Sequence, residues 1–232
     1  MIAGARPSYD PVARRLGVRV VYDGAASAGK STNLSALAEA LPQAVLELRL
    51  GEQIAGTTVT LDWLRLRGGV HGDVPVIVEA VCAPSARALA AARAQLLRAA
   101  HAIVVVCDAT PRGVRALRAA GTPDGPRVWQ ANKQDLPGAS AGSALVAALG
   151  RPDEPVIEAS AARGKGIVDT FLAALRVAAE GLRGSKAPVT IHAEASARER
   201  LTRRLARAPV DGDAAAELWL RAAAMELARG RA

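Results

Sequence analysis

The residues best suited to chemistry in this sequence of 232 residues are those from Gly24 to Ser31, which follow the phosphate-loop pattern G-x-x-x-x-G-K-[ST]. Small side chains let backbone N–H groups converge on phosphate oxygens, and the positive end of the following helix adds its dipole. Lys30 can neutralise the terminal phosphates, and Ser31 can offer its hydroxyl to Mg²⁺. The residues predicted to bind phosphate are Gly24, Ala25, Ala26, Ser27, Ala28, Gly29, Lys30, Ser31 and Thr32.

A second motif, Asn132-Lys133-Gln134-Asp135, matches the pattern N-K-x-D that recognises guanine. The carboxylate of Asp135 can accept hydrogen bonds from the base N1–H and the exocyclic amine, a donor pair that adenine lacks. We therefore expect Asn132, Lys133 and Asp135 to bind a guanine base. The pair Ser160-Ala161 resembles an element whose backbone amide meets the guanine carbonyl, although two such residues carry little information alone.

The elements needed to position these motifs can be read from the hydrophobic pattern. Residues 18–22 are typical of a strand, and the phosphate loop then leads into a helix from about Lys30 to Leu41. Two further runs, Thr57 to Leu66 and Val74 to Cys82, are joined by a glycine-rich connection and predict a hairpin. The first of them alternates imperfectly, as an edge strand would, and Leu46 to Leu50 suggests another short strand.

The rest of the core alternates helices with strands, and the apolar run Ile103 to Cys107 is typical of a parallel strand covered on both faces. This order predicts the α/β class, with a doubly wound, mostly parallel sheet of about six strands and one antiparallel edge strand. The other expected elements are helices near 85–100, 112–120, 140–149 and 167–182, and strands near 127–131 and 156–159.

Beyond residue 184 the composition changes, and two helical stretches are expected near 194–207 and 213–229. We divide the chain into a lead (1–16), a phosphate-loop domain (17–184) and a C-terminal helical extension (185–232). The extension has two interpretations: a helical flap packed on the domain, or an arginine-rich element that docks a partner or a membrane surface.

Composition excludes several other classes of protein. The net charge of +8 comes with no recognised nucleic-acid motif, so nucleic acid is not an expected partner. Cys82 and Cys107 lie in or at the ends of apolar runs, and no Cys/His cluster has zinc-ligand spacing. We find no signal-peptide pattern and no apolar run of about eighteen residues, so we expect a cytoplasmic protein without a transmembrane segment.

With both motifs in this order, residues 17–182 resemble a Ras-like small GTPase, and more narrowly the bacterial MglA-type polarity and gliding GTPases. The narrower resemblance rests on Val20-Val21-Tyr22, Lys30 to Leu34, Thr58 to Leu66, and Asn132 to Pro137. It implies GTP/GDP and Mg²⁺ as cofactors and a nucleotide-gated switch that controls protein localisation or polarity. It also implies effector proteins and a Roadblock-type activating protein as partners.

The sequence departs from this family where hydrolysis is promoted. Ser85 and Ala86 stand where small GTPases carry Gly-Gln, and the Gln orients the attacking water. Cys82 stands where the general family has an Asp that helps hold Mg²⁺, an Asp that MglA-type proteins also lack. Ala26 occupies a loop position that is generally Gly in efficient hydrolases. We therefore expect slow or partner-dependent hydrolysis, with Ala86 at the catalytic Gln position.

Lys30 and Thr58 are the predicted catalytic residues. Thr57 and Thr58 are the hydroxyl residues of the expected switch region, so Ser31, Thr57 and Thr58 are the predicted metal ligands. Two alternatives stay open: a pseudo-GTPase that binds GTP, or nothing, and acts as a scaffold, and an ATP-binding phosphate-loop protein.

Overall fold

The computed structural model describes residues 8–10, 14–41, 45–54, 57–71 and 74–180, and the side chains of 14–41, 61–67 and 75–180. The predicted C-terminal helices and most of the predicted lead lie outside the described residues.

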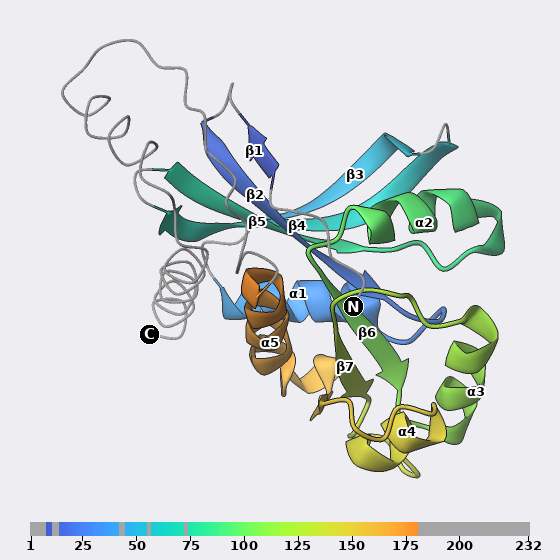
Figure 1. Cartoon of the computed structure of the whole chain (residues 1–232). Coiled ribbons are helices and arrows are strands. Elements are labelled where there is room, and N and C mark those ends of the chain that lie inside the picture. Colours follow the sequence, from blue (N-terminus) through green and yellow to red (C-terminus); the bar gives the residue numbers. More distant parts are fainter. Residues whose placement is uncertain (1–7, 11–13, 42–44, 55–56, 72–73, 181–232) are drawn as a thin grey trace, which may run out of the picture.

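A mixed β-sheet of eight strands forms the centre of the described structure (Figure 1). Its strand order is β3-β4-β5-β2-β6-β7-β8, and β1 pairs with β2 outside this path. The strands are β1 (Ser8–Asp10), β2 (Arg15–Asp23), β3 (Val45–Ile54), β4 (Thr57–His71), β5 (Val74–Cys82), β6 (Ala102–Asp108), β7 (Arg127–Asn132) and β8 (Val156–Glu158).

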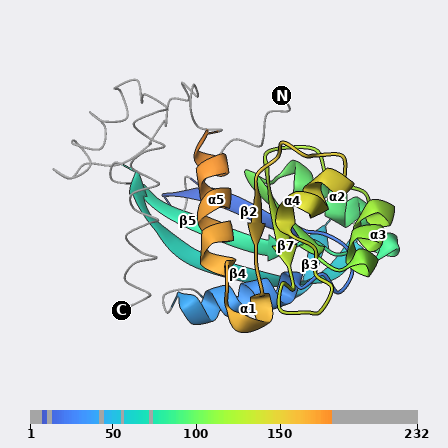
Figure 2. The same cartoon turned by 90° about the horizontal axis from the view of Figure 1, so that it is seen from below.

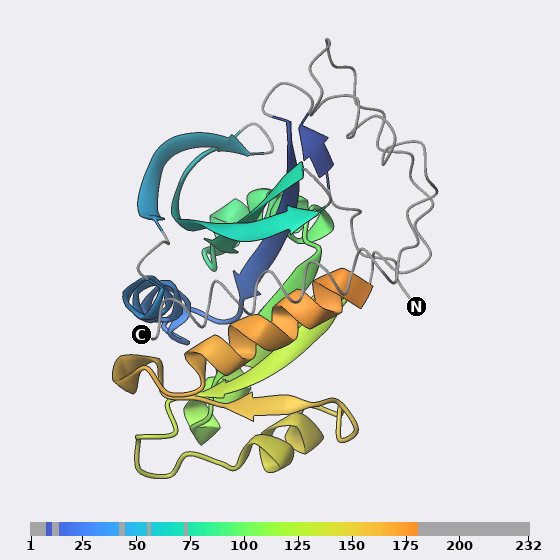
Figure 3. The same ribbon diagram turned by 90° about the vertical axis from the view of Figure 1, so that its left-hand side faces the viewer.

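The neighbours β5, β2, β6, β7 and β8 are parallel, whereas β4 is antiparallel to both β3 and β5. The predicted hairpin is confirmed as β4 and β5. An antiparallel strand does form this edge, but it is β3 and not the predicted Thr57 to Leu66, because β3 pairs along the outer side of β4 and makes β4 an interior strand. Figure 3 shows β3 and β4 curving together at one end of the sheet. The described sheet has two strands more than the predicted six: β3, which the sequence suggested only as a short strand at Leu46 to Leu50, and β1, which carries no recognisable strand pattern.

The helices are α1 (Lys30–Ala40), α2 (Ala90–Arg98), α3 (Pro111–Ala120), α4 (Gly142–Ala148) and α5 (Ile167–Glu180), with short 3-10 turns at Arg87–Leu89 and Ala161–Arg163. Figure 2 shows α2, α3 and α4 gathered on one side. In the described part of the chain, no helix is both long and apolar enough to cross a membrane.

Two buried clusters cover the two faces of the sheet. One joins Val104 and Val106 of β6 to residues of α1 and α5, and the other joins Ile103 and Val105 to residues of α2, α3 and α4. Because successive side chains of a strand point to opposite faces, an unbroken apolar run suits a strand covered on both sides. The sequence prediction for this central strand is therefore confirmed. The parallel strands end at one edge of the sheet, where the loops with both sequence motifs lie.

Candidate functional site

The phosphate-loop segment turns between β2 and α1 with two glycines that no other residue could replace without movement. Gly24 has a φ of +147°, and an added Cβ would lie 2.2 Å from the carbonyl oxygen of Val106 on β6. Gly29 has a φ of +100°, and its Cβ would lie 2.3 Å from Nδ2 of Asn132. Both positions favour glycine conformationally and sterically. The motif glycines therefore seat the loop against β6 and against the second motif.

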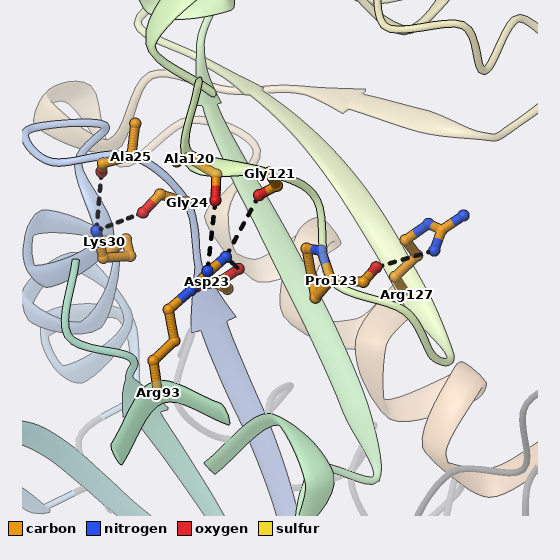
Figure 4. A network of polar contacts seen from close by, with 9 residues as sticks. All are labelled: Asp23, Gly24, Ala25, Lys30, Arg93, Ala120, Gly121, Pro123 and Arg127. Atoms are coloured by element: carbon orange, nitrogen blue, oxygen red, sulfur yellow. Dashed lines mark hydrogen bonds and ion pairs between the residues drawn. The ribbon is translucent and has the colours of Figure 1, made fainter. Parts of the chain in front are cut away.

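The ammonium of Lys30 folds back over the loop. Its Nζ donates to the carbonyl oxygens of Gly24 at 3.1 Å and Ala25 at 2.9 Å (Figure 4). The side chain is 8% exposed, and this burial lowers its pKa, although the nearby charge of Asp23 opposes the effect. Lys30 therefore places a largely desolvated amine within the loop, where an anion would interact with it strongly.

A cavity of about 510 Å³ opens beside this lysine. It combines part of the phosphate loop with the ends of two strands and with the second motif. Its lining residues are Ser27, Gly29, Lys30, Ser31, Thr32, Leu61, Asp62, Cys82, Ala83, Pro84, Ser85 and Lys133. The structure thus brings five of the predicted phosphate-binding residues and Lys133 together around one space.

The segment after β5 forms one wall of this cavity but carries no side chain that could orient a water as a Gln does. Ser85 lines the cavity, and Ala86, which precedes the 3-10 turn at Arg87–Leu89, has only a methyl group. Burial, reinforced by the charge of Asp62, raises the pKa of the Cys82 thiol to about 12. Cys82 is consequently a neutral thiol at physiological pH.

Asn132 connects the loops of the two motifs. Its Nδ2 donates to the carbonyl of Ala28 at 2.9 Å, and its Oδ1 accepts from the backbone N–H of Ala161 at 2.9 Å. The side chain is almost fully buried. One amide therefore ties the phosphate loop to the Ser160-Ala161 element. The sequence indicated these three segments, but it did not indicate that Asn132 joins them.

Asp135, the last residue of the second motif, is held in its ionised form. It accepts a hydrogen bond from the Ser160 hydroxyl at 2.5 Å, and this bond lowers its pKa. Arg163 lies 3.9 Å from the carboxylate. Lys133 has a positive φ of 66° and donates to Asp108 at 2.9 Å. An ionised, oriented Asp135 has the chemistry needed to accept two hydrogen bonds from a base.

Thr57 and Thr58 are placed only as backbone. They begin β4, where they pair with Ile54 and Gln53 of β3, and their side chains lie outside those described. In the segments that the structure describes, no group of three or more His, Cys, Asp or Glu side chains could hold a metal ion. The assignment of the two threonines as metal ligands stays a prediction.

An ion pair that the sequence did not predict involves the residue that directly precedes the phosphate loop. Arg93 of α2 donates to the two carboxylate oxygens of Asp23 at 2.7 and 2.6 Å. The same guanidinium reaches the carbonyls of Ala120 and Gly121 at the end of α3, at 3.5 and 3.3 Å (Figure 4). Asp23 is an acidic residue that directly follows the apolar residues Val20 to Tyr22, and this signal could have revealed it. The pair fastens α2 to the residue that precedes Gly24.

A second missed network joins three elements behind the loop. Gln130 on β7 donates to Asn33 of α1 at 2.8 Å and to Thr170 of α5 at 3.0 Å. Asn33 in turn donates to the carbonyl of Gly29 at 2.9 Å. The first turn of α1 is thereby fixed to the strand that carries the second motif.

Comparison with known proteins adds no assignment, since no family model matches the chain and no curated protein matches it either.

Proposed function

We propose that this chain is a guanine-nucleotide-binding protein of the Ras-like phosphate-loop type, acting as a switch with slow or partner-dependent GTP hydrolysis. The observation that carries the proposal is the pair of hydrogen bonds of Asn132, which joins a lysine-bearing phosphate loop to the loops around Asp135. The groups proposed to bind phosphate and to read the base are thus linked through one side chain.

The residues around the cavity suit Mg²⁺ bound with phosphates. Ser31 lines the cavity beside Lys30, and a hydroxyl oxygen is a ligand that Mg²⁺ accepts. Thr57 and Thr58 remain the proposed additional ligands. When bound, Mg²⁺ would supply charge neutralisation at the β- and γ-phosphates. The chain's own contribution is to orient the triphosphate along the loop and to place the Lys30 ammonium against it.

Slow turnover is expected from the cavity wall formed by Cys82 to Ser85 and from Ala86, which follows it. Phosphoryl transfer depends on positioning and charge stabilisation, and Ala86 cannot orient a water. Lys30 and Thr58 are the proposed catalytic residues. We extend the proposal to effector proteins and to a Roadblock-type activating protein that would complete the site, controlling localisation or polarity in the cytoplasm.

The alternative function is a pseudo-GTPase that binds nucleotide without hydrolysing it and serves as a scaffold. It is favoured by the same segment, in which neither Ser85 nor the following Ala86 can take the catalytic role of the Gln. Single-turnover hydrolysis of GTP, with and without a candidate activating protein, separates the two functions. Product formation in either reaction supports the switch, and a flat trace in both supports the scaffold.

Binding itself is tested by titrating the full chain with fluorescent GTP and ATP in the presence of Mg²⁺. We expect saturable binding of GTP and much weaker binding of ATP. Asp135→Asn removes the carboxylate that accepts from guanine, so GTP affinity should fall by about tenfold or more, which corresponds to roughly 1.4 kcal/mol. Asp153→Asn, an exposed residue in the loop before β8, is the matched control. Equal uptake of GTP and ATP would contradict guanine recognition.

A further inference from the structure

The cavity contains one acidic side chain that the sequence motifs leave without a role. Asp62 of β4 lines the same cavity as Lys30 and Ser31 and is only partly buried. It lies on the strand beyond β5, outside both nucleotide motifs. Its carboxylate is therefore the candidate anionic oxygen ligand on this side of the cavity.

The sheet register explains how Asp62 reaches the cavity. In the antiparallel ladder of β4 and β5, Leu64 pairs with Ala80 and Trp63 with Val81, so one further step places Asp62 opposite Cys82. Cross-strand neighbours of this kind have Cβ atoms about 4.5–5.5 Å apart. Leu64, Ala80 and Cys82 all belong to the cluster under α1, so alternation directs Asp62 to the same face.

The thiol of Cys82 lies between the carboxylate of Asp62 and the hydroxyl of Ser31. Tyr22, at the end of the strand that leads into the phosphate loop, pairs with Cys82. Burial and the charge of Asp62 raise the pKa of Cys82, while a hydrogen bond with Ser31 acts in the opposite direction. Cys82 of β5 therefore has two neighbours in space: Asp62 of β4 on one side and Ser31, in the first turn of α1, on the other.

Magnesium chemistry distinguishes these groups. Mg²⁺ prefers oxygen ligands and is usually held in phosphate sites by one or two carboxylates together with phosphates and waters. A neutral thiol is a poor ligand for this ion. Building on the proposed function, we propose that Asp62 supplies the carboxylate that holds Mg²⁺ beside Ser31, directly or through a water, from the strand next to Cys82.

The test is the Mg²⁺ dependence of nucleotide retention, which needs no hydrolysis. Full-length protein is loaded with fluorescent GDP, and the nucleotide dissociation rate is measured across a Mg²⁺ titration and in EDTA. Asp62→Asn should raise the Mg²⁺ midpoint about tenfold to a hundredfold, the range for losing a group that supports a metal. The dissociation rate in EDTA should stay within about twofold, because the phosphate loop is unchanged.

Three further variants sharpen the result. Asp62→Ser, which differs in size, should give the same shift, and Asp153→Asn should give none. Adding Cys82→Asp to Asp62→Asn returns a carboxylate to the neighbouring strand and should lower the midpoint again. Urea unfolding of each variant verifies that it is folded.

Equal midpoints for the wild type and both folded Asp62 variants would overturn the proposal. Repeating the titration with fluorescent ADP separates this inference from the proposed function. Equal retention of ADP and GDP would remove guanine selectivity, while the Mg²⁺ shift would still decide the role of Asp62. Failure of the wild type to retain either nucleotide would overturn both.

Discussion

At the scale of single residues, the site depends on side chains that bind the protein itself. Asn132 is the clearest case, because a motif residue expected to contact a base uses both ends of its amide to connect loops. Its burial leaves no water to replace these bonds. The geometry of the site therefore depends on Asn132, whether or not this side chain contacts a ligand.

Asn132→Ala tests this connection. It leaves the carbonyl of Ala28 and the N–H of Ala161 without their partner, and each buried unsatisfied group costs about 1–3 kcal/mol. We expect the free energy of unfolding, measured in urea, to fall by at least that amount and GTP affinity to fall with it. Ser143→Ala, at an exposed position on α4, should change neither. Full stability with weakened binding would instead make Asn132 a direct ligand.

The residue types of the site could be predicted, but their partners could not. The phosphate loop has a fixed spacing because adjacent backbone amides must converge, so Gly24, Gly29 and Lys30 are recognisable in sequence. Asp23 and Arg93 are 70 residues apart and follow no fixed spacing. The position of Asp62 depends on the register of β4 with β5, which alternation alone does not specify.

At the scale of elements, α2 is attached to the central sheet by charge. The carboxylate of Asp23 is 1% exposed, and the bidentate bond from Arg93 raises the pKa of that guanidinium. A buried carboxylate that loses its partner costs much more than the pair contributes. Arg93 thus holds α2, the helix that follows the cavity wall of Cys82 to Ser85, to the strand that leads into the phosphate loop.

Arg93→Met keeps much of the side-chain volume but removes the charge. We expect it to lower the free energy of unfolding by about 3–5 kcal/mol, because Asp23 is left buried and unpaired. Adding Asp23→Ala removes the uncompensated charge, so the double variant should be more stable than Arg93→Met alone. Urea unfolding of the four proteins in this cycle measures the coupling, and strictly additive effects would contradict it.

Arg127, Trp129 and Glu154 form a second attachment, between β7 and the loop before β8. Glu154 accepts from Arg127 at 2.8 and 2.5 Å and from Trp129 at 2.6 Å. The bonds from Arg127, followed by that from Trp129, lower the pKa of Glu154 from 4.5 to about 2. Because the folded-state pKa is below the unfolded one, this stabilisation is present above pH 4.5 and is lost as the pH falls toward 2.

Glu154→Gln should therefore be less stable than the wild type at neutral pH by about 1.5–3 kcal/mol, the usual contribution of hydrogen bonds to a charged group. The difference should shrink as the pH falls below 4.5. Urea unfolding of both proteins across this range provides the measurement. A difference that does not vary with pH would exclude the charge of Glu154 as its source.

At the scale of the whole molecule, the central strands of the sheet could largely be predicted from the sequence. The pairing of β3 with β4 at the edge of the sheet could not. The strands β2, β5, β6 and β7 can be recognised from their apolar residues, because each contributes to the buried clusters on both faces of the sheet. The interior position of β4 depends on β3, for which the sequence suggested a short strand at Leu46 to Leu50 but not its pairing with β4. Pairing between such strands is decided by neighbours rather than by local pattern.

Ligand binding should stabilise this whole assembly. A nucleotide at a hundred times its dissociation constant adds about 2.7 kcal/mol, and each kcal/mol shifts the melting temperature by roughly 2–4 °C for a domain of this size. We expect GTP with Mg²⁺ to raise the Tm by roughly 5–10 °C in differential scanning calorimetry. ATP at the same concentration should raise it much less, and equal shifts would refute base selectivity.

Trp63 on β4 and Trp129 on β7 are both buried, and each lies beneath an arginine, Arg19 at 5.1 Å and Arg127 at 5.8 Å from the ring centroid. They stand on opposite sides of the central strands. The described part of the chain therefore carries an intrinsic optical probe on each side of these strands, one of them adjacent in sequence to Asp62. Variants that keep only Trp63 or only Trp129, with Trp219 also replaced, would reveal by emission whether both halves melt together, without any attached dye.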